Sequence, residues 1–283
     1  MRHGLILIDK PAGITSHDCV ARVRAALHER DVGHLGTLDP AATGLLVLAV
    51  GRKALKVVEL FRDLPKEYEA QVRFGMVSTT YDGDGVLSQV PAKPGWIPPP
   101  LEIVRNTIAD RFLGKIEQVP PAYSAVHVGG ERAYRKMRQG RTVQIPARQV
   151  EIKECTILSY DYPVLRLRIA CGSGTYIRSL AHDLGAVLHT GAYLERLRRT
   201  RVGEWRIENA VPLANALWSS IIPLKDVLAD QSAVRLSMAQ MQDVRCGRDV
   251  DVPVTSQVIA WYGDLPIAIL VPVEGRAHAR KVL

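Results

Sequence analysis

The sequence predicts an α+β fold, with one large mixed domain at residues 1–228 and a small all-β domain at residues 229–283. Its 283 residues exceed one average domain and fall short of two large ones. Strand-like and helix-like segments follow one another irregularly, without the β-α-β alternation of a doubly wound parallel sheet. After about Lys225 the pattern changes to short β-type runs, which indicates the second domain.

The first half of the large domain starts with a strand and then mixes helices and strands. Leu5 to Asp9 is apolar and runs into a turn at Lys10-Pro11-Ala12-Gly13, and Thr15 or Ser16 can cap the helix that follows. Apolar spacing and alternation then predict a helix at 20–27, a buried strand at 45–50, a helix at 54–61 and a strand at 67–74.

A segment with five prolines, residues 91–100, leads into the second half as a linker or surface excursion. The same patterns then predict a helix at 101–112, a strand at 123–128, a basic helix at 131–138, strands at 149–160 and 164–171, and a helix at 175–188. In the small domain they predict a short helix at 237–244 and β-type runs at 258–262 and 266–272.

Composition narrows the classes of function. Lys+Arg exceed Asp+Glu by 37 − 29 = 8, which favours a polyanionic partner such as nucleic acid. The four cysteines lie far apart without a Cys-x-x-Cys pair, so we expect reduced thiols, a cytoplasmic protein and no zinc site. No His-x-x-x-His pair supports a catalytic metal, and no apolar run is long enough for a signal peptide or a membrane span.

The loop at residues 33–44 is the most informative segment, and it contains Asp39. Asp39 precedes a proline, and glycines on both sides permit a sharp loop that a ligand could approach. The loop leads into the predicted buried strand at 45–50, which would hold the carboxylate rigidly. A carboxylate placed in this way can act as a nucleophile or as an acid or base. The alternative is an Asp-Pro pair that merely begins a turn.

Arg178 lies in the first turn of the helix predicted at 175–188, after the small-residue turn at 172–174. The helix dipole slightly disfavours a cation there, so an acidic partner would explain its presence. We therefore predict an ion pair between Arg178 and Asp39 that keeps the acid ionised and oriented. A solvated surface arginine is the alternative. A phosphate-binding loop is a weaker one, because the Gly-Lys-Ser/Thr ending is missing.

Two dense basic clusters are candidate contacts to a nucleic-acid backbone. Their members are Arg132, Arg135, Lys136, Arg138 and Arg141 in the first, and Arg196, Arg198, Arg199 and Arg201 in the second. On a strand, Arg196 and Arg198 share one face and Leu197 faces the other. Tyr68 and Tyr176 could stack on bases, and His34 could stack or donate to RNA. Ordinary solvated or core positions are the alternative for all of these residues.

Taken together, these segments resemble the TruB family of bacterial tRNA pseudouridine-55 synthases. The Gly-His-Leu-Gly-Thr-Leu-Asp-Pro run at 33–40 is the most specific match. The other matching segments, in chain order, are residues 9–16, 66–68, 80–82 with Gly85, 118–125, 132–134, 174–180 and 197–203.

The resemblance implies a catalytic domain of the pseudouridine synthase type, built on a curved mixed β-sheet, and a small PUA-like RNA-binding domain at the C-terminal end. It implies isomerisation of uridine 55 in the T-loop of tRNA by an aspartate nucleophile with base flipping, without a cofactor. Asp39 matches the nucleophile, Arg178 its partner and Tyr68 the stacking tyrosine, also a candidate for the final proton transfer. His34, Tyr176 and Leu197 match positions that line the flipped nucleotide.

The partner expected from the resemblance is the T-stem-loop of tRNA. A monomer without an obligate protein partner is the family expectation. Two alternatives remain open: a non-catalytic RNA-binding or tRNA-folding protein, and an aspartyl-nucleophile hydrolase with another substrate. The hydrolase leaves the basic clusters unexplained.

Overall fold

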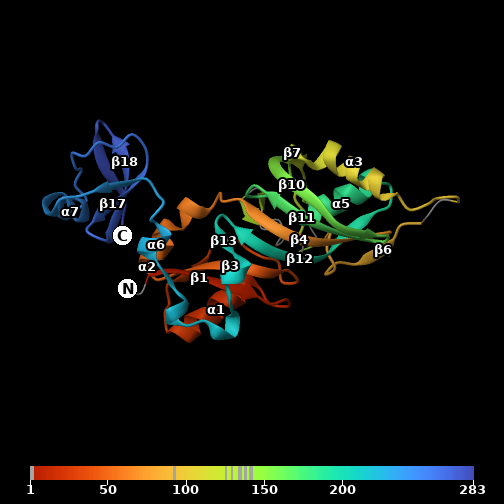
Figure 1. Cartoon of the computed structure of the whole chain (residues 1–283), viewed down its shortest axis with the longest axis horizontal. Coiled ribbons are helices and arrows are strands. Elements are labelled where there is room, and N and C mark those ends of the chain that lie inside the picture. Colours follow the sequence, from red (N-terminus) through yellow and green to blue (C-terminus); the bar gives the residue numbers. More distant parts are fainter. Residues whose placement is uncertain are drawn as a thin grey trace.

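A long mixed sheet runs through most of the molecule, and a smaller sheet lies beyond one end of it (Figure 1). This computed structural model describes residues 3–91, 94–124, 126–128, 130–132, 136, 139 and 143–283. The main path of the large sheet has the strand order β14-β1-β3-β12-β4-β11-β10-β7, with β2, β13 and β15 paired at its side. The α+β class and the mixed sheet predicted from the sequence are confirmed.

The strands of the large sheet come from both ends of the large domain. They are β1 (Gly4–Lys10), β2 (Val32–His34), β3 (Thr43–Val50), β4 (Lys66–Phe74), β7 (Gly114–Gln118), β10 (Arg148–Asp161), β11 (Val164–Cys171), β12 (Ala192–Val202), β13 (Trp205–Arg206), β14 (Val211–Pro212) and β15 (Ile222–Pro223). β12 joins the two halves of the sheet, because it pairs with β3 in parallel and with β4 antiparallel.

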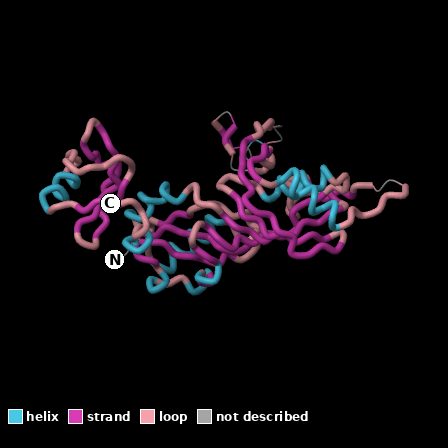
Figure 2. The backbone as a smooth tube through the Cα atoms, turned by 45° about the horizontal axis from the view of Figure 1, so that its top comes forward, coloured by secondary structure: helices cyan, strands magenta, loops and turns pink. Residues whose placement is uncertain are grey.

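Helices cover the band of strands on more than one side (Figure 2). The described helices beside the large sheet are α1 (Ser16–Leu27), α2 (Arg52–Val57), α3 (Leu101–Phe112), α5 (Ile177–Val187) and α6 (Leu224–Val227), whereas α7 (Met238–Arg245) packs against the small sheet. Thr15 caps α1 with its side chain and forms a capping box with Asp18, which sets the start of that helix. At the other end of the sheet, α3 and α5 lie beside β10 and β11 (Figure 1).

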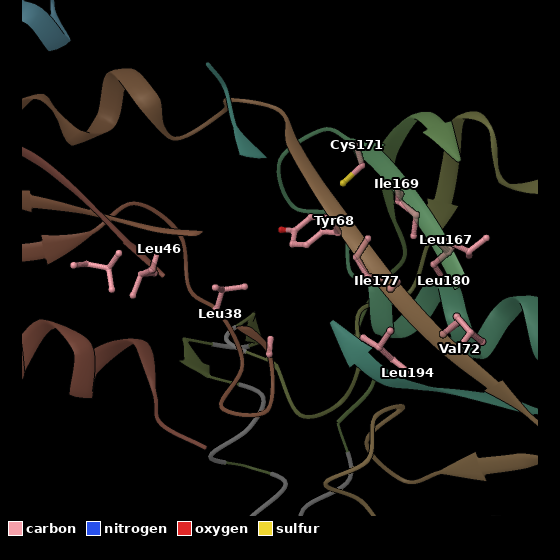
Figure 3. Packing of buried hydrophobic residues seen from close by; sticks show 14 of the residues in the cluster. Leu38, Leu46, Tyr68, Val72, Leu167, Ile169, Cys171, Ile177, Leu180 and Leu194 are labelled. Atoms are coloured by element: carbon pink, nitrogen blue, oxygen red, sulfur yellow. The ribbon is translucent and has the colours of Figure 1, made fainter. Parts of the chain in front are cut away.

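Two clusters of buried residues lie on opposite faces of β1 and β3. Along β3, Leu46 and Leu48 belong to the cluster that also contains apolar residues of α1, α3 and α5. The alternate residues, Leu45 and Val47, belong to the cluster that includes α2 and part of the small sheet. This two-sided burial explains why β3 is a continuous apolar run rather than an alternating one. Figure 3 shows part of the first cluster, from Leu46 and Leu38 across to Leu167 and Leu180.

The small sheet has the order β16-β17-β18-β19, with α7 packed against β18 and β19. Its strands are β16 (Ala233–Arg235), β17 (Val258–Tyr262), β18 (Leu265–Val273) and β19 (Arg276–Val282). Two short pairs, β5 (Met76–Ser78) with β6 (Leu87–Gln89) and β8 (His127–Val128) with β9 (Glu131–Arg132), lie outside both sheets. No helix among the described residues is long and apolar enough to cross a membrane.

Two predicted elements differ from the structure. Of the strand expected at 123–128, the described residues form a strand at His127–Val128, whereas Tyr123 and Ser124 lie in a bend. The basic helix expected at 131–138 begins instead with strand β9, because Glu131 and Arg132 pair back onto Val128 and His127. Most of the remaining positions of that segment lie outside the described residues. The domain boundary after residue 228 stays a prediction.

Candidate active site

Asp39 lies in the loop between β2 and β3, with its side chain 40% exposed. Two neighbours, Leu38 and Ala42, are buried in the main core and anchor the loop on both sides of it. Gly44, at the start of β3, has φ +99°, and a Cβ there would collide with the backbone of Arg199. Only glycine therefore lets β3 approach β12 at the base of this loop.

The N-terminal segment holds the loop from one side. The ammonium group of Lys10, which is completely buried, donates to the carbonyls of Pro11, Ile14 and Pro40. The hydroxyl of Ser16 donates to the carbonyl of Leu38 (3.0 Å) and accepts from the amide of Leu38 (2.9 Å). The backbones of the residues on both sides of Asp39 are thus tied to residues 10–16.

Arg199 holds the same loop from the opposite side. Its side chain projects from β12 and the residue is only 2% exposed. The guanidinium donates to the carbonyls of Leu45 (2.7 Å), Gly36 (3.0 Å) and Thr37 (3.4 Å). Consequently, the carbonyls on both sides of Asp39 are bound by two buried cations, Lys10 and Arg199, and the position of the carboxylate is preorganised.

The ion pair predicted between Asp39 and Arg178 is confirmed. Nε of Arg178 lies 3.0 Å from Oδ2 of Asp39, and Nη2 lies 3.4 Å from Oδ1. Arg178 is at the second position of α5, with its side chain 6% exposed. The rest of its guanidinium is also bound, because Nη1 donates to the carbonyl of Thr80 (3.2 Å) and Nη2 to that of Tyr123 (3.1 Å).

Asp82 is a second carboxylate at the same guanidinium. Its Oδ2 lies 3.2 Å from Nη1 of Arg178, and its side chain is 13% exposed. The other oxygen, Oδ1, accepts from the hydroxyl of Thr80 and from the amide of Asp84. Asp82 lies in a segment that matches the family, but the sequence predicts no role for it. The Tyr-Asp-Gly-Asp-Gly run at 81–85 is similar to part of a calcium loop, but the remaining ligands are missing.

The surroundings of Asp39 shift the pKa of its carboxyl group in opposite directions. Burial raises the pKa of Asp39, although part of its side chain is accessible, because protein surrounds most of the carboxylate. The Arg178 guanidinium opposes this rise, whereas the charges of Asp82 and Asp84 add to it. A carboxylate that is accessible yet poorly solvated is a stronger nucleophile than one in open water.

Tyr68 lies in β4 among Ile169, Cys171 and Ile177 of the main core, and only 9% of its surface is exposed. Figure 3 shows its hydroxyl oxygen directed away from these neighbours and toward the part of the core that contains Leu38 and Leu46. Burial is the main cause that raises the pKa of Tyr68, so the phenol stays protonated at neutral pH.

The other residues expected to line a nucleotide lie on three different elements. His34 in β2 is hydrogen-bonded to the Thr37 hydroxyl (2.9 Å), and burial lowers its pKa. Tyr176 precedes α5, and its backbone exchanges two hydrogen bonds with the Gln118 side chain. Leu197 in β12 is half-buried against the main core. Among the residues that the structure describes, no hydrogen bond or ion pair joins these three side chains to Asp39, so their roles stay predictions.

The predicted RNA-contact arginines separate into three groups. Arg196 is exposed on β12, and Arg198 forms a bidentate pair with Asp9 at 2.8 and 3.1 Å. The prediction for Arg199 is wrong: its guanidinium is buried against backbone carbonyls and is not available to phosphate. Arg132 lies in β9, where its side chain is not described, and Arg135 and Arg138 lie outside the described residues.

No cluster of three or more His, Cys, Asp or Glu side chains that could hold a metal occurs within the part of the chain that the structure describes. The four cysteines are free thiols in the structure, as the sequence predicts.

Comparison with known proteins gives two family matches. The N-terminal domain of the TruB family of pseudouridylate synthases matches residues 24–177. The C-terminal domain of tRNA pseudouridylate synthase B matches residues 178–228.

Curated relatives include tRNA pseudouridine synthase B of Trichormus variabilis, 47% identical over 75% of this chain and 71% of the relative. The enzyme of the same name from Gloeobacter violaceus is 45% identical over 82% of this chain and 81% of the relative. Among solved structures, the archaeal box H/ACA sRNP Nop10-Cbf5 complex matches with a TM-score of 0.72 at 23% identity, covering 100% of this chain and 85% of that chain. That similarity shows the fold.

Proposed function

Because the chain belongs to the TruB family of pseudouridylate synthases, we propose that it isomerises uridine 55 in the T-loop of tRNA to pseudouridine, with Asp39 as the nucleophile. The names of its relatives support tRNA as the substrate. The observation that carries the proposal is the Asp39 carboxylate, held by Arg178 on a loop that Lys10 and Arg199 fix from both sides.

The first step is binding of the folded T-stem-loop. The net charge of +8 attracts the phosphate backbone, and exposed Arg196 is a suitable contact. The family expectation for the small domain at residues 229–283 is a further RNA-binding surface. The target nucleotide must leave the loop stack, which costs a few kcal/mol. Stacking against an aromatic ring or His34 can offset part of that cost.

The chemical step breaks the glycosidic C–N bond and forms a C–C bond between the same uracil and ribose. Asp39 attacks the nucleotide, uracil is released within the site and turns, and the new bond to its carbon closes while the bond to Asp39 breaks, which restores the carboxylate. A proton leaves that carbon and another is placed on the freed ring nitrogen, so the reaction needs no oxidant or reductant. Arg178 holds the carboxylate in the attacking geometry and compensates its charge.

Tyr68 fits a role in stacking on the nucleobase better than the role of the group that accepts the final proton. Its raised pKa keeps the phenol protonated, and a protonated phenol cannot accept the proton from the uracil carbon. We propose that the Tyr68 ring supports the base by stacking. His34, Tyr176 and Leu197 keep the roles that the family resemblance implies, as residues that line the flipped nucleotide.

The test uses an unmodified tRNA transcript and nucleotide-resolved mapping of pseudouridine. Wild type is expected to modify position 55, and Asp39→Asn is expected to bind tRNA normally but form no product. Asp31→Asn, at an exposed aspartate before β2, is the matched control and should retain full activity. Wild-type activity in Asp39→Asn would refute the nucleophile, and product at another uridine would refute the position. Binding of tRNA by wild type without any product would favour an RNA-binding or tRNA-folding role.

A further inference from the structure

An aromatic stack joins α5, the helix that carries Arg178, to the segment that binds the Arg178 guanidinium. The rings of Tyr81 and His182 are parallel within 10°, with centroids 3.9 Å apart. His182 comes four residues after Arg178 in α5, so the two side chains project from the same face of the helix, one turn apart. Tyr81 belongs to the separate segment between β5 and β6.

Tyr81 lies between two residues that both bind Arg178. The carbonyl of Thr80 and the carboxylate of Asp82 each lie 3.2 Å from the same nitrogen, Nη1 of Arg178. The residue in the middle therefore sets the orientation of both acceptors. Its own carbonyl accepts from the amide of Leu194 (2.9 Å), which ties this segment to β12 as well.

The backbone at Tyr81 is in a conformation that a bulky residue adopts only when its surroundings enforce it. Its φ is +66°, in the left-handed region that disfavours aromatic side chains. Such a conformation persists where other contacts stabilise it, and these conformations cluster at functional sites. The stack on His182 is the side-chain contact that holds the ring of Tyr81 in place.

His182 contributes its ring rather than a charge. Its Nδ1 is buried and has no hydrogen-bond partner among the residues that the structure describes. Burial lowers the pKa of His182, which keeps the imidazole neutral near pH 7. A neutral ring adds no repulsion to the nearby guanidinium, which is consistent with a role in packing.

We propose that Tyr81 and His182 are positioning residues for Arg178, because their stack locks the Thr80 and Asp82 acceptors to the helix that carries the guanidinium. The inference rests on the proposed function, since Arg178 in turn orients Asp39. One helix thus supplies both the cation and, one turn later, the ring that aligns the acceptors of that cation. Neither Tyr81 nor His182 is expected to touch the nucleotide.

The kinetic test compares ring-deleting variants with ring-retaining ones. Tyr81→Ala and His182→Ala are expected to lower kcat about tenfold with little change in tRNA Kd, because small misplacements of catalytic groups are costly. Tyr81→Phe and His182→Phe keep a stacked pair and should restore most of the rate. Tyr162→Ala is the control: it deletes another stacked tyrosine, on Phe74, outside this site, and should leave kcat unchanged.

Hydrogen exchange gives a readout that does not depend on catalysis. The amides of Thr80, Asp84 and Leu194 are hydrogen-bonded to or within this segment, so His182→Ala should accelerate their exchange while Tyr162→Ala should not. The proposal is overturned if exchange at these amides is unchanged, or if folded alanine variants keep the wild-type kcat. It is also overturned if the phenylalanine variants lose as much activity as the alanine variants. A wild-type protein that forms no pseudouridine would instead refute the proposed function, and the exchange result would still decide the positioning role.

Discussion

Replacing Arg199 by methionine tests whether this residue stabilises the loop that contains Asp39 or binds RNA. The guanidinium donates to the carbonyls of Gly36, Thr37 and Leu45. Water can replace it at Gly36 and Thr37, which are exposed, but not at Leu45, which is completely buried. Losing one charge-assisted hydrogen bond and leaving that acceptor unsatisfied is expected to lower the free energy of unfolding by about 2 kcal/mol.

Urea denaturation measures this loss, and Arg196→Met is the matched control on the same strand. Arg196 is exposed, so its substitution should change the free energy of unfolding by less than about 0.5 kcal/mol. The salt dependence of tRNA binding should respond in the opposite way. Arg196→Met should make the slope of the logarithm of the tRNA binding constant against the logarithm of salt concentration shallower, by about the amount that one phosphate contact contributes. Arg199→Met should leave this slope unchanged.

The reverse pattern of results would refute the structural role of Arg199. If Arg199→Met were as stable as wild type and reduced the salt slope, Arg199 would be a phosphate contact and the loop would not depend on it. A loss of stability of equal size in Arg196→Met would show that the effect is not specific to the buried guanidinium.

Three further predictions follow from the geometry of the site. Arg178→Ala should reduce kcat much more than it weakens tRNA binding, and a defect mainly in binding would contradict the ion-pair role. Because burial raises the pKa of Asp39, the single-turnover rate should fall as the pH decreases through that raised pKa. A rate that does not change until the pH reaches the ordinary aspartate range would contradict the raised pKa. Gly44→Ala places a Cβ against the Arg199 backbone at a position with positive φ, so it should lower the melting temperature. Gly13→Ala should lower it far less, because φ is also positive at Gly13 but the space around it is open. Equal decreases in melting temperature would argue against the close approach of β3 to β12.

The Asp39–Arg178 pair shows how much of the site could be predicted. Both residues lie in distinctive local segments, and a cation in the first turn of a helix calls for a carboxylate partner. The residue types indicated a contact between positions 139 residues apart, and the family resemblance favoured it over a solvated surface arginine. The apolar run of β3 likewise contained enough information to predict a strand buried on both faces.

The residues that support this pair were not predicted, because their roles depend on long-range register. Arg196, Arg198 and Arg199 are alike in residue type, but alternation along β12 places Arg199 on the face of Leu197, and the pairing of β12 with β3 and β4 buries it beside the Asp39 loop. Alternation indicates the face on which Arg199 lies, but the residue type alone does not show that an arginine on that face is buried against backbone carbonyls. The stack of Tyr81 on His182 is similarly invisible, because nothing local to either residue indicates the other.

The place of β12 between β3 and β4 has a consequence for synthesis of the chain. Residues 192–202 leave the ribosome after both Asp39 and Arg178 have been made, yet β3 and β4 become neighbours of one strand only when this segment inserts. The same insertion brings Arg199 to the carbonyls beside Asp39. Pairing of β3 and β4 with a common strand and the binding of Arg199 to the Asp39 loop therefore both require residues 192–202, and a nascent chain that ends before residue 192 contains Asp39 and Arg178 without this support.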